Sequence, residues 1–280
     1  GAGNAQPPEK YEDQRKLDLV RAEKSLKLFL NTRINAVEKK DKRIVAVLGQ
    51  DIRTGRRIRF SGKLFADCTG DGNLGFLAGA DYRYGRESRS ETDEELAPEQ
   101  ADRIVMGTSV QWYSKATDKP TSFPETPWAV QFTDQNYQRA TQGEWNWETG
   151  FRWDQIEQFE MVRDHGLRAV FGNWSFQKNH APDKDKYANR ELDWVAYIGG
   201  KRESRRLLGD VILRQQDIVE GKEFPDASVT TTWTIDLHYP IQSDQFPEIE
   251  FRSRAHHLRI KPYAIPYRCF YSRNLDNLFM

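Results

Sequence analysis

Four cationic side chains within six residues form the densest group in the sequence that could bind an anion. The members are Lys201, Arg202, Arg205 and Arg206. An arginine fork can bind a carboxylate or a phosphate through two parallel hydrogen bonds, although the cluster could also be a structural ion-pair network with Glu203 and Asp210. Long cationic side chains are rarely buried without a partner. We therefore expect at least one of Arg202 and Arg205 to be partly buried, at a cleft between two domains, and bonded to a carboxylate or a backbone carbonyl.

A histidine and an aspartate lie two residues apart near the end of a predicted strand. Residues 229–237 alternate threonine with apolar residues, as a β-strand does, and Asp236 and His238 close this stretch. A period of two places both side chains on one face, where the carboxylate could orient the histidine as a general base. A histidine at a strand end can also be a satisfied polar residue, and both interpretations stay open.

A glycine-rich turn follows an apolar run and precedes a helical pattern. The turn residues are Thr69, Gly70, Asp71 and Gly72. The order predicts a strand, a tight turn with positive φ, and a helix that begins near Gly72, whose first amides would favour an anion such as phosphate. Gly70, Gly72 and Gly75 match the letters G-x-G-x-x-G, but no second strand ending in an acid follows about 20 residues later. We therefore do not predict the primary dinucleotide site here.

The elements that position these residues belong to an α+β fold. A charged stretch from Tyr11 to about Lys27 predicts a helix with one apolar face. Short β-rich runs between Leu28 and Thr69 predict an antiparallel meander that leads into the glycine turn. A second helix is expected over Asp154–Val170, followed by a polar loop over 173–188.

Composition excludes several classes of protein. The chain has 280 residues with 42 Lys+Arg and 42 Asp+Glu, so its formal net charge is zero, which argues against nucleic acid as a partner. No apolar run approaches the roughly 20 residues needed to span a bilayer. Cys68 and Cys269 lack metal-ligand spacing, and His256-His257 lacks further ligands. No metal site is expected.

Several motifs together resemble a known family. They are Phe65-Ala66-Asp67-Cys68-Thr69-Gly70-Asp71-Gly72, Leu77-Ala78-Gly79-Ala80, Gly85-Arg86-Glu87-Ser88, Met106-Gly107-Thr108-Ser109, the stretch 200–210, Ile235-Asp236-Leu237-His238 and Ile265-Pro266-Tyr267-Arg268. In this order they resemble the FAD-dependent oxidoreductases of the FAD-oxidored group. The resemblance covers roughly Tyr11 to Met280.

The resemblance implies both a fold and a reaction. Residues 1–107 would form part of an FAD-binding domain of the α/β type, 108–260 a mixed substrate domain, and 261–280 a return strand. The reaction would transfer a hydride from a small organic substrate, with a sugar as one candidate, to FAD. The residues expected near the flavin or substrate are Arg202, Arg205, His238 and Tyr267. Those expected to contact the cofactor are Thr69, Gly70, Asp71 and Gly72.

Family members also carry a G-x-G-x-x-G segment upstream and a flavin-facing segment downstream of the region that this chain matches. The resemblance therefore implies a fragment that is inactive alone, with FAD bound by the full-length protein. We expect the chain to purify colourless. An absorbance spectrum with and without added FAD tests this expectation, and a stoichiometric flavin band would contradict it.

An aromatic excess suggests an alternative function. The sequence has 8 Trp, 11 Tyr and 15 Phe, with a dense patch from Trp145 to Trp153. Such a patch could form the sugar-stacking surface of a non-catalytic carbohydrate-binding module. The same residues could instead pack in the core.

Overall fold

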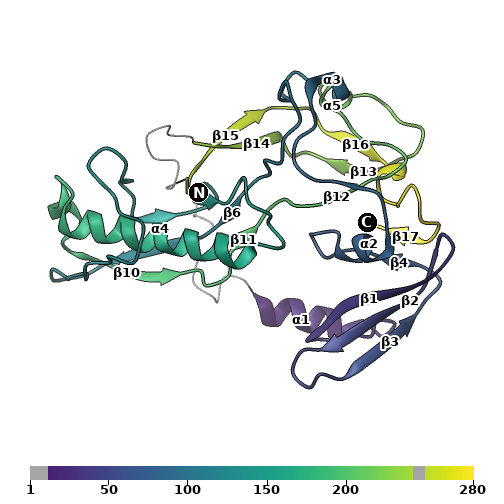
Figure 1. The fold of residues 1–280 in the computed structure, drawn as a ribbon, viewed down its shortest axis with the longest axis horizontal. Helices are drawn as coiled ribbons and strands as arrows, with labels where there is room; N and C mark the ends of the chain where they lie inside the picture. The colour runs from purple at the N-terminus through teal and green to yellow at the C-terminus, as the bar shows by residue number, and fades with distance from the viewer. Residues whose placement is uncertain (1–11, 242–249) are drawn as a thin grey trace. The chain divides into compact units, whose positions relative to one another are not determined.

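The computed structural model describes residues 12–241 and 250–280. Backbone contacts divide the chain into two compact units, each assembled from separate segments. The meander unit contains residues 12–103, Ser204–Thr234 and Arg259–Met280; the α4 unit contains Ile104–Glu203 and the described part of Ile235–Leu258. Each unit mixes helices with strands (Figure 1), so the predicted α+β class is confirmed. The predicted middle domain also included 204–234, and the roles assigned to the predicted domains stay predictions.

The largest sheet of the meander unit is the predicted antiparallel meander. Strands β1 (Thr32–Lys40), β2 (Arg43–Asp51) and β3 (Arg57–Ser61) pair in that order. Asp41, between β1 and β2, has a φ of 54°, the left-handed conformation that a two-residue hairpin turn needs. Ile44 and Ala46 are buried, whereas Arg43 and Val45 are exposed, so the first half of β2 has one core face. The meander prediction is confirmed for these three strands.

The glycine turn follows a strand that does not belong to the meander. β4 (Phe65–Ala66) pairs in parallel with β17 (Leu278–Phe279). The prediction that this strand is the last of the antiparallel meander is therefore wrong. The amide of Asn277 binds this pair to the meander, since its Nδ2 donates to the carbonyls of Ile44 (2.8 Å) and Lys63 (3.1 Å). Helix α2 (Asn73–Ala78) begins directly after Gly72, as predicted.

The meander unit is completed by short elements. They are α1 (Asp13–Ala22), β5 (Tyr82–Arg83), α3 (Arg89–Thr92), β12 (Arg206–Leu207), α5 (Gln215–Val219), β13 (Ala227–Thr231) and β16 (Tyr263–Pro266). β5 pairs with β12 and β13 with β16, both antiparallel. The first predicted helix is therefore shorter than expected, and Tyr11, its predicted start, lies outside the described residues. Ile44, Leu74 and Leu278 belong to one buried cluster, which joins the two ends of the unit's sequence.

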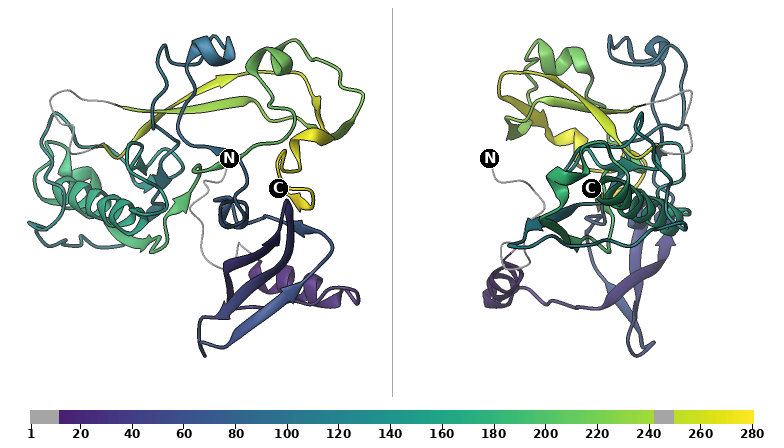
Figure 2. Two further views of the ribbon diagram at one scale, coloured as in Figure 1. Left: turned by 45° about the vertical axis from the view of Figure 1, so that its right-hand side comes forward. Right: turned by 90° about the vertical axis from the view of Figure 1, so that its left-hand side faces the viewer.

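The α4 unit packs one long helix against short antiparallel sheets. Its elements are β6 (Thr108–Ser109), β7 (Trp112–Ala116), β8 (Gln142–Gly143), β9 (Glu148–Thr149), α4 (Phe159–Asn179), β10 (Arg190–Val195), β11 (Gly200–Lys201), β14 (Ile235–Pro240) and β15 (Ser253–Leu258). Helix α4 contacts β6 and β9, and Figures 1 and 2 show it as the long helix of this unit. Trp112 is fully buried, and its ring meets those of Trp147 and Trp174 edge to face. The unit's core is therefore largely aromatic.

Helix α4 extends beyond its predicted end. The prediction of a loop from residue 173 is wrong as far as Asn179, because polar residues of this stretch are buried in the helix and hydrogen-bonded there. Asn173 and Gln177 are both fully buried. Asn173 Nδ2 donates to the Gln138 carbonyl (2.9 Å), and Gln177 Nε2 donates to the Ala140 carbonyl (2.9 Å). The polar residues of this segment form a buried hydrogen-bond network and are not exposed to solvent as a loop would be.

Replacing Gly172 in α4 by alanine is expected to destabilise the protein. Helix propensity alone would favour alanine by about 1 kcal/mol. However, a Cβ on Gly172 would lie 1.9 Å from the Val130 carbonyl oxygen, a backbone atom that no rotamer change can move. We expect the free energy of unfolding to fall by about 1–3 kcal/mol, measured by urea denaturation. Glu160→Ala, on an exposed position of the same helix, is the control, and equal stability of the Gly172 variant and the native protein would contradict the packing.

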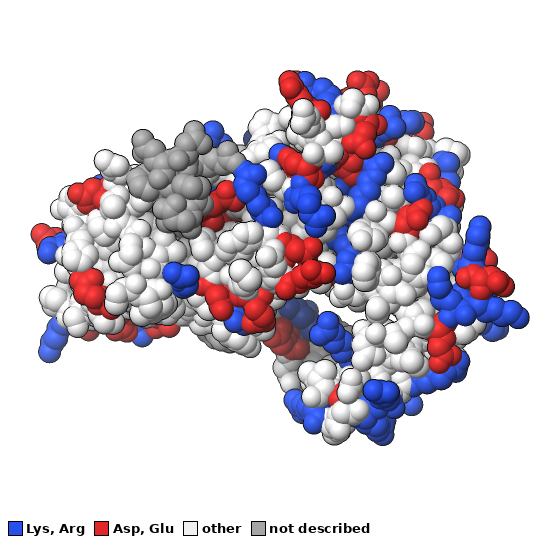
Figure 3. Space-filling view, viewed as in Figure 1, with Lys and Arg blue, Asp and Glu red and all other residues white. Residues whose placement is uncertain are grey.

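The visible surface carries both charge signs. Figure 3 shows Lys and Arg interspersed with Asp and Glu over the face it presents, in keeping with the zero net charge. In the described residues, no helix has both the length and the apolar character required to cross a membrane.

Candidate active site

Strands β14 and β15 present one polar face in the α4 unit. Their antiparallel register places Asp236 opposite His257, His238 opposite Ala255, and Pro240 opposite Ser253. Since side chains alternate along a strand, these residues share a face. The predicted common face of Asp236 and His238 is therefore present.

His238 lies between two carboxylates. Glu148 Oε2 is hydrogen-bonded to Nδ1 of the ring, and Asp236 Oδ1 lies 3.2 Å from Nε2. Ser253 Oγ lies 3.1 Å from Nδ1. The histidine side chain is only 6% exposed and that of Glu148 is fully buried. A proton on Nδ1 is held by Glu148, and a positive charge on the ring is stabilised from both sides.

Arg202 supplies the positive charge of this cluster. Its Nε lies 3.6 Å from Glu148 Oε1, and its Nη1 lies 3.4 Å from Nδ1 of His238. The side chain is 18% exposed, and its guanidinium carbon lies 5.6 Å from the centre of the Trp145 ring. Arg202 is thus partly buried beside a carboxylate without a hydrogen bond to it. The expected partly buried, bonded arginine is Arg205, whose Nη1 donates to the backbone carbonyl of Asp71. Its predicted position at a cleft between domains stays a prediction.

Glu148 is the residue that sequence reasoning missed. It stands between Trp147 and Thr149 in the aromatic patch, which was interpreted only through its rings. Burial raises the pKa of Glu148, while hydrogen bonds from Ser253 and His238 and the charge of Arg202 act in the opposite direction. The sequence signal that could have identified Glu148 is an acidic residue within an aromatic stretch, because an acid that is buried there needs polar or charged partners.

The raised pKa of Glu148 predicts a pH-dependent stability. Ionised Glu148 is less favourable in the folded protein than in the unfolded chain. The contribution of the protonated side chain to folding stability is therefore fully present below about pH 4.5 and is lost as pH rises through the pKa of the folded state. We expect the stability advantage of the native protein over Glu148→Gln to shrink as pH rises above 4.5. Urea denaturation across this range measures the difference.

The matched control for this measurement is Glu160→Gln, whose side chain is 74% exposed. Its stability difference from the native protein is expected to stay flat with pH. A stability advantage of the native protein over Glu148→Gln that stays constant, or that grows as pH rises, would contradict the burial of a desolvated carboxylate at this position.

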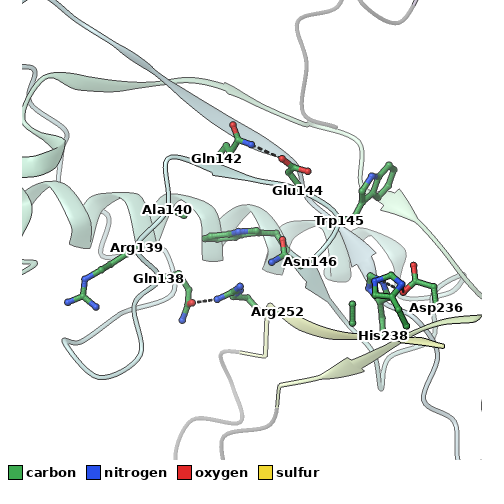
Figure 4. A pocket seen from close by; sticks show the side chains of 13 residues that line it. Gln138, Arg139, Ala140, Gln142, Glu144, Trp145, Asn146, Asp236, His238 and Arg252 are labelled. Atoms are coloured by element: carbon green, nitrogen blue, oxygen red, sulfur yellow. Dashed lines mark hydrogen bonds and ion pairs between the residues drawn. The ribbon is translucent and has the colours of Figure 1, made fainter. Parts of the chain in front are cut away.

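The face of β14 and β15 lines a cavity of about 560 Å³. This volume lies within the range of small-molecule sites. The lining residues are Gln138, Arg139, Ala140, Gln142, Glu144, Trp145, Asn146, Trp147, Asp236, His238, Arg252, Ala255 and His257. Figure 4 shows His238 and Asp236 together on one side of this cavity and Arg252 with Gln138 on another. The lining combines polar and aromatic side chains, with a titratable group at the wall.

The remaining predicted catalytic residues belong to the meander unit. Arg205 Nη1 lies 3.5 Å from the Asp71 carbonyl oxygen, and its guanidinium carbon lies 3.9 Å from the centre of the Phe76 ring. Tyr267 is 46% exposed and packs beside the Tyr271 ring. Of the four predicted catalytic residues, the structure brings Arg202 and His238 together.

The glycine turn satisfies its own amides. Asp67 accepts hydrogen bonds from the backbone N–H of Thr69 (3.0 Å) and of Gly75 (2.8 Å), and Thr69 Oγ1 accepts one from the N–H of Asn73 (2.9 Å). The expectation that the first amides of this helix favour an anion is therefore wrong for Asn73 and Gly75, whose N–H groups already donate within the turn. Gly70 is exposed, has a φ of 78° and has open space on its side-chain side. The turn has room for a ligand beside the backbone of Gly70, but it does not offer a ring of free amides that could enclose a phosphate.

The aromatic patch is mainly core. Trp147 and Phe151 are buried, whereas Trp145 is 42% exposed. The patch therefore does not present a continuous sugar-stacking surface, and the core interpretation accounts for these two rings. The carbohydrate-binding alternative has no support in this geometry.

Comparison with known families agrees with the sequence motifs. A family model described as FAD dependent oxidoreductase matches residues 14–280. The chain belongs to this family. Comparisons with curated proteins and with solved structures found no match.

Proposed function

We propose that this chain handles the substrate of a flavoprotein that removes a hydride from a small organic molecule and passes it to FAD. The observation that carries the proposal is His238 at the cavity wall, with a carboxylate beside each ring nitrogen. Family membership supplies the redox class. No lining residue singles out a sugar among small organic substrates.

The proposed role of His238 is to accept a proton. When an alcohol or amine loses a hydride from carbon, its O–H or N–H must lose a proton so that the C=O or C=N bond can form. FAD, when bound, takes the hydride with its two electrons. Nε2 of His238 takes the proton, because Glu148 holds the other ring proton on Nδ1. Asp236 then stabilises the imidazolium, and Arg202 balances the charge of Glu148.

For FAD itself, the proposed contacts are Thr69, Gly70, Asp71 and Gly72. Because the neighbouring amides are bonded within the turn, these residues would hold the cofactor through the exposed backbone at Gly70. Arg205 and Tyr267 are proposed side-chain contacts to the flavin or substrate.

Anaerobic reduction of the flavin tests the proposal. The flavin-loaded protein that contains this chain is mixed with a panel of small alcohols and amines, and the oxidised-flavin absorbance is followed. Stoichiometric bleaching by a panel member, with formation of its carbonyl or imine product, is expected. If light reduces the flavin but no member of the panel does, the assigned reaction class is contradicted.

A further inference from the structure

Arg252 places a positive charge at the cavity without a carboxylate partner in the described residues. One Nη group donates to Oε1 of Gln138, and the buried Nε has no hydrogen-bond partner among the residues that the structure describes. Burial without a counter-ion lowers the pKa of Arg252, since a partly desolvated charge is less stable alone. An anion that reaches this guanidinium would relieve that cost.

Uncharged side chains hold Arg252 in place. The backbone N–H of Gln138 donates to Oδ1 of Asn173 (2.6 Å), and Nδ2 of Asn173 donates back to the Gln138 carbonyl (2.9 Å). Asn173 also donates to Oε1 of the fully buried Gln177 (2.7 Å). The amide network runs from α4 to the guanidinium and fixes its position without neutralising its charge.

The other charges at the cavity already lie beside partners. Arg139 is paired with Asp183, outside the cavity lining, at 3.1 Å. Glu144 accepts a hydrogen bond from Gln142 at 2.6 Å, and Asp236 lies 3.2 Å from His238. The hydrogen bond from the neutral amide of Gln142 leaves the negative charge of Glu144 in place. This charge disfavours a second negative charge on the ligand, so the cavity suits a monoanion better than a dianion such as a phosphate ester.

The spacing along the strands sets the length of the ligand. Arg252 precedes Ala255 by three residues, and Ala255 stands opposite His238. Arg252 directly precedes β15, and three residues of extended chain span roughly 10 Å between Cα atoms. Figure 4 shows Arg252 and His238 on different sides of the cavity. A molecule bound at both ends must therefore carry several bonds between its two polar groups.

We propose that Arg252 binds a carboxylate and that the substrate is an organic monoacid whose oxidised carbon lies several bonds from that carboxylate, near His238. The oxidised end rests on the proposed function. Carboxylate binding does not, because it needs neither flavin nor turnover.

Binding to the 280-residue chain without flavin tests the proposal. The probe is para-hydroxymethylbenzoate, with its neutral amide and the corresponding phosphonate as comparisons, and the readout is quenching of tryptophan fluorescence from Trp145 and Trp147. We expect the carboxylate to bind about tenfold or more tightly than the amide. Arg252→Met should remove this preference while leaving weak binding of the amide unchanged. Arg252→Lys should retain part of the preference, since it keeps charge without the planar fork.

The control is Arg139→Gln, a cavity arginine that Asp183 already neutralises, and its affinities should change less than about twofold. Circular dichroism verifies that each variant is folded. Equal binding of carboxylate and amide, no saturable carboxylate binding at tens of millimolar, or tighter binding of the phosphonate would each overturn the monoacid proposal. Flavin reduction by a neutral alcohol in the separate anaerobic experiment would then leave the oxidoreductase function intact.

Discussion

Replacing His238 by asparagine is expected to slow turnover of the flavin-loaded protein by about a hundredfold to ten-thousandfold. The amide nitrogen of asparagine stands near the position of Nδ1, so the hydrogen bond to Glu148 is retained. The variant lacks Nε2, which faces Asp236 at 3.2 Å and is the proposed proton acceptor. Turnover at saturating substrate, measured across pH, should therefore lose both its rate and the rising limb that deprotonation of a general base produces.

His256→Asn is the matched control for this experiment. His256 lies on β15, the strand that pairs with β14, and it is exposed. It stands opposite Leu237, so it points to the opposite face from His238 because strand side chains alternate. Its turnover and pH profile should stay close to those of the native protein. If His238→Asn kept the native rate and pH dependence, His238 would be a structural residue of the α4 unit and another group would move the proton.

Replacing Lys178 by methionine is expected to lower the free energy of unfolding by about 3 kcal/mol. The ammonium of Lys178 donates to three backbone carbonyls, those of Tyr187 (2.8 Å), Ala188 (3.0 Å) and Arg190 (2.9 Å), and to Oγ1 of Thr121 (3.1 Å). Methionine keeps the length of the stem but removes the charged donor and leaves the Tyr187 carbonyl unpaired, at about 1–3 kcal/mol for a buried group. The carbonyls of Ala188 and Arg190 keep hydrogen bonds from the backbone N–H (3.0 Å) and Oγ1 (2.6 Å) of Thr121. Thermal and urea denaturation measure the loss.

Lys184→Met is the comparison for Lys178→Met. Lys184 Nζ makes one exposed hydrogen bond, to the Asn179 carbonyl at 3.2 Å. We expect its stability to change by less than about 0.5 kcal/mol, as for most surface substitutions. Equal effects of the two substitutions would show that Lys178 does not hold the segment after α4 against the helix.

The sequence predicted features that depend on local periodicity. Alternating apolar residues indicated the meander, the glycine turn indicated the start of α2, and two-residue spacing placed Asp236 beside His238. It did not predict Glu148 or Arg252 as site residues, because their partners lie far away in the chain: 90 residues separate Glu148 from His238 and 114 separate Arg252 from Gln138. The loop expected from residue 173 was wrong for the same reason, since the groups that satisfy Asn173 belong to a distant segment.

The long reach between Ile44 and Asn277 also affects how the protein folds during synthesis. These residues are 233 positions apart, yet the Asn277 amide pairs with both backbone groups of Ile44. At about 5–20 residues per second, a ribosome needs roughly 10–50 s to add the intervening chain. Throughout that interval, Ile44 and the apolar face of β2 have been made, but the Leu278 that covers them has not. During synthesis the nascent meander unit therefore exposes apolar surface that chaperones can bind. Most of the α4 unit, in contrast, is one continuous segment, Ile104–Glu203, which is synthesised within this interval.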